Sequence, residues 1–360
     1  MLERSKTIGA VIQGGSGGRF ITDAERGGVY HDMCCGTGCT GIQDGNLNAR
    51  IISKFPAVPH NTYNYPTVWR QEAEAELEAT YPGYDFAFFS GGAECTEAAL
   101  RCAAALLGED LGAETHAFKG CFHGKTWWTG ILGGAHMSPE YNQPITLRQP
   151  SIVIFEPMQT RNGVRVATHD FLRNLQYETN RTESIAIADE ISTTIRSGHR
   201  LLTHELGGNW TPHIICVGKN IGQGFPVAVV GVRQDLCNKL LRRGVSLTSG
   251  FGGNPWACIA VKETLQYVRE TKLLAHIQDS SQAMHKVLAD TLRNNPAVEE
   301  VTGVGMWFGV RFVNEKVRDQ VVSRLLVNRY IVSPCGVSSI RMSPPFSLGL
   351  NDWIDFCEAV

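Results

Sequence analysis

The middle of this chain alternates between short runs of apolar residues and longer stretches with helical spacing, and that alternation limits the fold more than any other feature. Helical spacing appears at residues 93–107 and 171–177. The apolar runs are four to six residues long and are separated by glycine-containing turns; they occupy residues 86–89, 152–155, 185–188, 214–217 and 227–232. Because such runs are apolar on both faces, they are typical of a mostly parallel sheet that helices cover on both sides. The sequence therefore predicts an α/β fold.

A different pattern begins at Trp256. Helical spacing continues to residue 268 and returns at 273–292 and near 317–326, and the strand-like segments are 306–312 and 339–342. We find no linker rich in proline or serine before this part of the chain. The sequence therefore predicts a second, smaller α+β domain that packs closely against the first.

The charges are balanced, with a formal net charge of −2. Since a chain of this kind has no general basic field, we expect no general binding of nucleic acid or of an anionic membrane. Residues 1–20 carry charges and glycines where a signal peptide has an unbroken apolar run, and the run at 225–232 is too short to cross a bilayer. We expect a cytoplasmic protein with no membrane segment, in which the eleven cysteines are free thiols.

Metal binding is not expected. Cys34, Cys35, Cys39 and His31 cluster near the N-terminus, but their spacing matches no common zinc site.

Two glycine-rich segments resemble nucleotide-binding loops without completing them. Residues 36–41 fit the dinucleotide pattern GxGxxG, but no carboxylate follows about 20 residues later to bind a ribose, so a simple glycine turn is favoured. Residues 120–126 have three residues between their glycines where a P-loop has four. The apolar run that ends in Asp189 and Glu190 resembles a Walker B strand. A P-loop ATPase therefore remains a distant alternative.

A third glycine-rich segment is a better phosphate site. At residues 88–94 a strand ends in glycines directly at the start of a helix. Free backbone N–H groups and the helix dipole favour an anion at such a position.

Seven segments of the chain, taken in order, resemble the class III pyridoxal-phosphate-dependent aminotransferases of fold type I. They are 88–100 (FFSGGAECTEAAL), 121–126 (CFHGKT), 155–159 (FEPMQ), 188–191 (ADEI), 218–226 (GKNIGQGFP), 251–255 (FGGNP) and 340–345 (IRMSPP). The resemblance runs from about residue 63 to the C-terminus. It implies a large domain with a mostly parallel seven-stranded sheet and a smaller α+β domain. The expected division is 1–54, contributing to the small domain, 55–255, binding the cofactor, and 256–360, forming the small domain.

The resemblance implies that Lys219 carries pyridoxal 5'-phosphate as a Schiff base and that Asp189 pairs with the pyridine nitrogen. The chemistry agrees, because this cofactor needs an amine nucleophile and a carboxylate that keeps its ring nitrogen protonated. A lysine between glycines after an apolar strand loses part of its charge through burial and becomes nucleophilic. A solvated surface lysine and a helix-capping aspartate are the ordinary alternatives.

Further cofactor contacts are implied by the same resemblance. Gly92 and Ala93 would give backbone N–H groups to the phosphate. Phe122 would stack on the ring with Ile191 behind it, although both also suit an ordinary core. Ser192 stands where glutamine or methionine usually approaches the ring oxygen.

Several departures from the family pattern fall where the substrate would bind. Lys125 occupies a position that is usually arginine, so a compact ammonium charge replaces a planar guanidinium group. Arg341 matches the arginine that grips a substrate carboxylate. Arg161 stands where members that use an ω-amino substrate often have a glutamate that neutralises that arginine. Two unmasked positive charges favour an acidic, phosphorylated or otherwise anionic substrate.

One departure concerns the expected homodimer, in which two subunits share each site. The threonine that usually reaches the partner subunit's phosphate aligns with Gly250. Thr248 or Ser249 is therefore expected to supply the hydroxyl.

The implied reaction moves an amino group between an amino acid, with anionic and atypical ones among the candidates, and an oxo acid or aldehyde, so that donor and acceptor are both small molecules. A decarboxylase or an aminomutase on the same scaffold is the main alternative, because the sequence does not fix which bond at the α-carbon breaks. A protein that binds the cofactor without catalysis is a more distant one.

Overall fold

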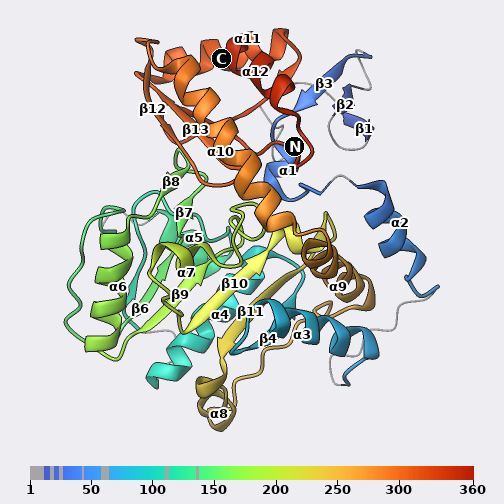
Figure 1. Ribbon diagram of the computed structural model, residues 1–360. Helices are drawn as coiled ribbons and strands as arrows, with labels where there is room; N and C mark the ends of the chain where they lie inside the picture. The colour runs from blue at the N-terminus through green and yellow to red at the C-terminus, as the bar shows by residue number, and fades with distance from the viewer. Residues whose placement is uncertain are drawn as a thin grey trace.

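The folded chain consists of two bodies, which lie one above the other in Figure 1. The computed structural model describes residues 12–16, 20–23, 27–42, 44–57, 65–109, 113–134 and 138–360. A large sheet with helices on both faces forms the lower body in Figure 1, and the C-terminal elements lie above it with the N-terminal strands beside them.

The large sheet follows the order β4-β11-β10-β9-β6-β5. Strand β11 is antiparallel to both of its neighbours, whereas β10, β9, β6 and β5 pair in parallel. The bounds of the strands are β4 Tyr84–Phe89, β5 Thr115–His116, β6 Ile152–Phe155, β9 Ile185–Asp189, β10 Ile214–Gly218 and β11 Ala228–Arg233. The predicted α/β class, with a mostly parallel sheet, is confirmed.

The expectation of seven strands is corrected by the structure. Among the residues that the structure describes, this sheet has six strands. The stretch before β6, residues 138–151, contains Pro139, Pro144 and Pro150 and forms no strand. Proline has no N–H to donate to a ladder, which opposes pairing there.

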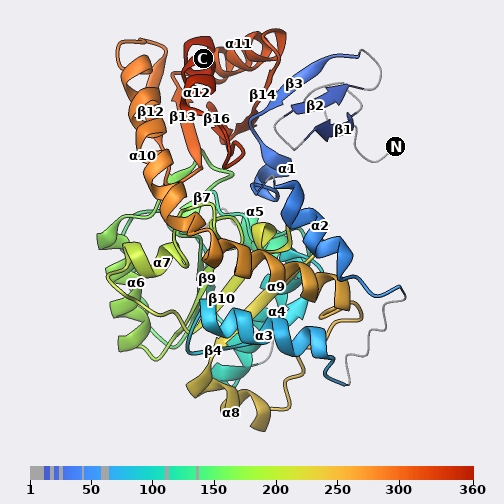
Figure 2. The same cartoon turned by 45° about the vertical axis from the view of Figure 1, so that its right-hand side comes forward.

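Both faces of the sheet are covered because the strand residues alternate between two cores. On β10, Ile214 and Cys216 pack with residues of α4, whereas Ile215 and Val217 belong to the core that contains residues of α3, α6 and α9. Figure 2 shows α3 and α9 side by side in front of the sheet, and these two helices are in contact. The helices of this body are α3 Val68–Thr80, α4 Gly92–Leu107, α5 Trp127–Gly134, α6 His169–Arg181, α7 Leu202–Leu206, α8 Gln234–Arg242 and α9 Pro255–Glu270.

The upper body is built on an antiparallel sheet in the order β12-β13-β16-β15. A second sheet joins the N-terminal strands to it, because β3 pairs in parallel with β14. These elements are β1 Ile12–Ser16, β2 Phe20–Asp23, β3 Val29–Asp32, α10 Leu273–Leu292, β12 Val298–Thr302, β13 Phe308–Phe312, α11 Glu315–Val327, β14 Tyr330–Ile331, β15 Ser333–Cys335, β16 Ser339–Met342 and α12 Leu350–Ala359. The β3–β14 pairing supports the proposal that the first 54 residues contribute to the small domain.

The glycine segment 36–41 takes a compact form after β3. Its first residues lie in the short helix α1 Cys35–Gly38, and α2 Gly45–Ser53 follows. Gly38 has φ +80°, and a Cβ there would lie 2.5 Å from the Trp307 ring. Only glycine combines that backbone conformation with so close an approach.

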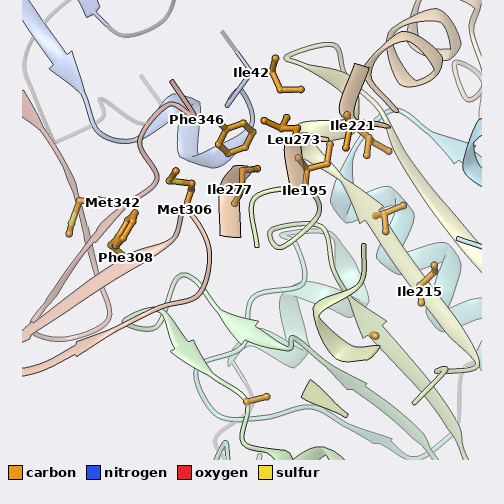
Figure 3. Packing of buried hydrophobic residues seen from close by; sticks show 14 of the residues in the cluster. Ile42, Ile195, Ile215, Ile221, Leu273, Ile277, Met306, Phe308, Met342 and Phe346 are labelled. Carbon is orange, nitrogen blue, oxygen red and sulfur yellow. The ribbon is translucent and has the colours of Figure 1, made fainter. Parts of the chain in front are cut away.

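Apolar residues from all parts of the chain meet between the two bodies (Figure 3). Ile42 from the N-terminal segment, Ile277 from α10 and Phe346 from the C-terminal part are buried in the same cluster as Ile195 and Ile221 of the lower body. This shared core fixes the upper body over the edge of the large sheet.

A fully buried arginine reinforces that junction. Arg196 donates hydrogen bonds to the carbonyl oxygens of Pro344 at 2.7 Å, of Met306 at 3.3 Å and of Thr40 at 3.3 Å. Its guanidinium also lies 4.7 Å from the ring centroid of Phe346. One side chain thus ties the N-terminal and C-terminal segments to the loop that follows β9.

Candidate active site

A cavity of about 450 Å³ lies where the large sheet meets the upper body. Residues that follow β4, β9 and β10 line it; they include Ser90, Gly91, Gly92, Ala93, Asp189, Ile191, Ser192 and Lys219. The carboxyl ends of parallel strands meet at one edge of a sheet, which is the usual ligand position in open α/β proteins. Larger hollows of about 580 and 510 Å³ lie elsewhere on the described surface, but no lysine lines either of them.

Lys219 is held in an unusual conformation at the end of β10. It opens the 3₁₀ helix η1 Lys219–Gly222 with φ +48°, a left-handed value that is uncommon outside glycine and is often found at functional sites. Its Nζ donates a hydrogen bond to Ser192 Oγ at 2.5 Å. Burial, assisted by the positive charge of Arg341, lowers the pKa of Lys219 to about 8. A larger share of this amine is therefore neutral near pH 7 than for an ordinary lysine.

Asp189 ends β9 as a buried carboxylate with defined partners. The parallel register places it opposite Cys216 of β10, three residues before Lys219. Asp189 Oδ2 lies 2.8 Å from His123 Nδ1, and Oδ1 accepts a hydrogen bond from the Ile191 N–H at 3.2 Å. Burial opposes a charge on His123, but its hydrogen bond to Asp189 raises the pKa of the ring well above the usual value.

His123 and Glu156 are the two buried polar groups of the site that the sequence did not single out. His123 Nε2 is buried without a hydrogen-bond partner among the described residues. Glu156 Oε2 accepts a hydrogen bond from the Phe122 N–H at 2.9 Å, and burial raises the pKa of Glu156 to about 7. Both residues lie inside segments on which the family resemblance rests. Their position in those segments is the sequence feature that could have identified them.

The start of α4 lies at the turn where residues 88–94 predicted an anion site. The helix begins at Gly92 after the N-cap Gly91, which has no side chain to satisfy the first N–H groups. A Cβ on Gly91 would meet nothing within 4 Å, so the space in front of this helix end is open. A Cβ on Gly92 would lie 3.1 Å from Ile191 Cδ1, which shows that Ile191 packs directly beside this turn.

The three basic residues predicted to meet substrate lie at or near the same cavity. Lys125 lines it directly. The Arg161 guanidinium lies 4.0 Å from the ring centroid of Phe122, which forms part of the cavity wall. Arg341, on β16, is buried, and its guanidinium lies 5.8 Å from the ring centroid of Trp307. Trp307 Nε1 in turn donates to the Ser192 carbonyl at 2.7 Å.

Thr248 and Ser249 do not line this cavity. Thr248 Oγ1 lies 3.1 Å from Ser246 Oγ, and Ser249 donates a hydrogen bond to Glu94 in the first turn of α4. Their role as a phosphate-binding hydroxyl stays a prediction.

Every helix among the described residues is too short or too polar to span a membrane. Within the same ranges, no group of three or more His, Cys, Asp or Glu side chains is placed to hold a metal ion.

Comparison with known proteins agrees with the predicted family and fold. The family described as "Aminotransferase class-III" matches residues 148–360. The acetylornithine aminotransferase of Bacillus subtilis (strain 168) is 31% identical to this chain over 92% of the chain and 89% of the relative. A [LysW]-aminoadipate semialdehyde/glutamate semialdehyde transaminase of Sulfurisphaera tokodaii is 26% identical over 93% of the chain and 90% of the relative.

Solved structures show the same fold. The ornithine delta-aminotransferase of Plasmodium falciparum superimposes with a TM-score of 0.83 at 20% identity, over 97% of this chain and 91% of that one. A transaminase from the marine bacterium Virgibacillus gives a TM-score of 0.84 at 17% identity, over 99% and 92%. The fold is that of the pyridoxal-phosphate-dependent transaminases, as predicted.

The chain belongs to the class III aminotransferase family. It is an aminotransferase, and this confirms the predicted family, enzyme class and reaction. Members of the class use pyridoxal 5'-phosphate. The distant alternatives of a P-loop ATPase and of a non-catalytic protein are therefore dropped.

Proposed function

We propose that this aminotransferase holds pyridoxal 5'-phosphate in the 450 Å³ cavity and that Lys219 is the lysine that carries it. One observation carries the proposal: an amine with a lowered pKa shares the cavity with a buried carboxylate, Asp189, and with the open start of α4. These are the three groups that this cofactor requires, namely a nucleophile, a partner for its ring nitrogen and a cradle for its phosphate. The residues present therefore fit the group.

The remaining cavity residues have matching roles in the proposal. Gly92 and Ala93 offer backbone N–H groups to the phosphate, and Phe122 and Ile191 enclose the ring from the cavity walls. Ser192 is placed to hold the Lys219 amine through its Oγ. When bound, the cofactor supplies an electron-accepting ring that stabilises negative charge at the α-carbon of an amino acid.

The chain's own side chains move and hold the protons. With a pKa close to neutrality, the Lys219 amine would take the proton from the α-carbon of the amino donor, and in the reverse half-reaction it would give a proton to the α-carbon of the acceptor. Asp189 presents a negative charge to a protonated ring nitrogen, and the hydrogen bond with His123 fixes the orientation of that carboxylate. Glu156 fixes the backbone of Phe122 and so the ring of that residue.

We infer that two copies of the chain form the functional unit. Phe251 is 76% exposed and Trp127 is 84% exposed, which is unusual for such large apolar side chains. Thr248 is exposed and lies outside its own cavity. These features support a dimer in which the loop at 246–251 reaches the site of the neighbouring copy.

The rate at which pyridoxal phosphate attaches to Lys219 is expected to depend on pH in a defined way. The neutral amine is the nucleophile, and its pKa is about 8. Attachment is therefore expected to slow about tenfold for each pH unit below 8 and to level off above it. Stopped-flow absorbance of the cofactor-free chain between pH 6 and 10 measures this rate. A rate that still rises beyond pH 9.5 would show an ordinary, solvated lysine.

Amine exchange tests the proposed function directly. The cofactor-loaded chain, given a ¹⁵N-labelled amino acid and an unlabelled oxo acid, is expected to form the ¹⁵N-labelled amino acid of the acceptor, measured by mass spectrometry. Release of carbon dioxide from the donor without transfer of label would identify a decarboxylase instead. Movement of the label within one molecule would identify an aminomutase. Failure to bind the cofactor at all would contradict the proposed site.

A further inference from the structure

A hollow of about 580 Å³ lies between the two bodies and shares no residue with the proposed cofactor cavity. Its lower wall consists of Asn142 and of residues between 162 and 168, in and after the hairpin of β7 Met158–Gln159 and β8 Arg165–Val166. Its upper wall consists of residues of β12 and β13 and of residues 336–339. Figure 1 shows β8 directly below β12 and β13. A hollow of this volume is large enough for a small molecule.

A row of polar side chains crosses the upper sheet at this hollow. The antiparallel register places Glu300 of β12 opposite Arg311 of β13, and Arg311 opposite Ser339 of β16. Directly opposite residues share one face of a sheet, and all three of these residues line the hollow. The Ser339 side chain is 3% exposed, and its hydroxyl forms no hydrogen bond with another described residue. This hydroxyl is therefore available to a polar ligand.

Arg165 brings a positive charge to the lower wall. Its Nη2 donates a hydrogen bond to the Tyr141 carbonyl at 3.4 Å, and its guanidinium lies 5.5 Å from the centroid of the Tyr141 ring. Within the described ranges Arg165 forms no ion pair, whereas Arg311 pairs with Glu299 at 3.3 Å and with Glu300 at 3.2 Å. One guanidinium group at the hollow thus remains free to pair with a carboxylate or a phosphate.

The rest of the lining is hydrophilic. Small-molecule sites are usually lined by apolar and aromatic side chains. Here no aromatic side chain lines the hollow, and its larger apolar side chains are those of Val166 and Val337. Hydroxyl and amide side chains form most of the remaining wall; they are Asn142, Asn162, Thr168, Thr302, Ser338 and Ser339. Such a wall matches a ligand with many hydrogen-bonding groups and little apolar surface.

The lower wall also touches the segment that leads to the active site. A Cβ on Gly120 would lie 1.9 Å from Asn162 Nδ2, so Asn162 packs directly against the backbone two residues before Phe122. The Gly336 N–H of the upper wall donates to the Arg161 carbonyl at 3.0 Å, which joins the two walls at one point. A ligand in the hollow would therefore contact both bodies and stabilise their junction.

We propose that this hollow binds a small anionic metabolite rich in hydroxyl groups, with its carboxylate or phosphate paired to Arg165. The hydroxyl groups of the ligand bond to the row that contains Ser339 and to the amide side chains of the lower wall. The site is separate from the cofactor cavity, so the inference does not depend on the proposed function.

Calorimetry on the cofactor-loaded chain tests the charge requirement with gluconate, glucose 6-phosphate and glucose. With the cofactor in place, the start of α4 is occupied, so the phosphorylated probe reports on the hollow. We expect at least one anion to bind about 10-fold more tightly than glucose or better. A preference for gluconate assigns the site to carboxylates, and a preference for glucose 6-phosphate assigns it to phosphates. Equal affinity for all three probes, or no binding, would overturn the inference.

Substitutions with opposite expected signs exclude a general loosening of the fold. Arg165→Gln is expected to weaken anion binding about 10- to 100-fold and to leave glucose binding unchanged. Glu300→Gln is expected to tighten anion binding about 2- to 5-fold, because it removes a like charge and releases Arg311. Arg173→Gln is the matched control, since Arg173 is an exposed arginine on α6 that pairs with Asp170. Unchanged anion affinity in Arg165→Gln would overturn the inference.

Thermal unfolding gives a second readout. The preferred anion at about 100 times its Kd is expected to raise the melting temperature of the unaltered chain and of Arg173→Gln, but at the same concentration not that of Arg165→Gln. The gluconate measurements can be repeated on the cofactor-free chain, where the same affinity is expected. Loss of cofactor binding or of amine exchange would therefore contradict the proposed function and leave this inference standing.

Discussion

Replacement of Lys219 by alanine is expected to lower amine exchange by about 10⁴-fold or more, because one substitution removes both the nucleophile and the group that moves the α-proton. The visible absorbance band of lysine-bound pyridoxal phosphate is expected to disappear as well. Far-ultraviolet circular dichroism should stay unchanged, since Lys219 contributes one hydrogen bond, to Ser192. Absorbance and labelled-amine exchange on the same preparation measure both effects.

Lys239→Ala is the matched control for this substitution. Lys239 is an exposed lysine near the end of α8 and lines no cavity described above. Its loss is expected to leave both the absorbance band and the exchange rate unchanged. If the Lys219 variant kept the band and the Lys239 variant lost it, the assignment of the cofactor lysine would be wrong.

Asp189→Asn is expected to reduce amine exchange about 10²- to 10³-fold, with the shape of the side chain retained. The amide cannot supply the negative charge that faces a protonated ring nitrogen, and His123 loses its charged partner. The absorbance of the bound cofactor is expected to change, because the protonation of its ring nitrogen changes. A variant that only loosened the fold would lower stability without that spectral change.

Glu190→Gln provides a control one residue away. Glu190 is as deeply buried as Asp189, but it bonds to Thr193 and to the Thr203 N–H at 2.7 Å, and it lines no part of the cavity. This substitution is expected to lower the free energy of unfolding in urea and to leave the cofactor spectrum in place. Equal spectral effects from both substitutions would contradict the special role of Asp189.

Much of the architecture was predictable because its determinants are local. The apolar runs at 152–155 and 214–217 became β6 and β10, and the helical spacing at 273–292 became α10. Strands buried on both faces need unbroken apolar sequence, and glycine marks the turns between them. The strand count was less accessible, since pairing depends on whether residues far along the chain present free N–H and C=O groups.

Some residues of the candidate site were predicted from the sequence and others were not. Lys219 and Asp189 were predicted through the family resemblance, and each lies at the end of an apolar strand, where a local motif is easy to recognise. His123 and Glu156 were not singled out, because their partners lie 66 and 34 residues away in the sequence. A histidine next to glycine has many possible roles, and its burial against a carboxylate is decided by the path of the chain.

The sequence by itself determined the fold class, the family and the two residues proposed to act on the cofactor, because periodicity and strand-end motifs are written in consecutive residues. The tertiary structure alone decided the buried His123–Asp189 pair and the junction held by Arg196. It also decided that Arg341 contacts the Thr160 carbonyl, 181 residues away in the sequence. Burial and contact between distant residues are properties of the folded chain, and no run of consecutive residues specifies them.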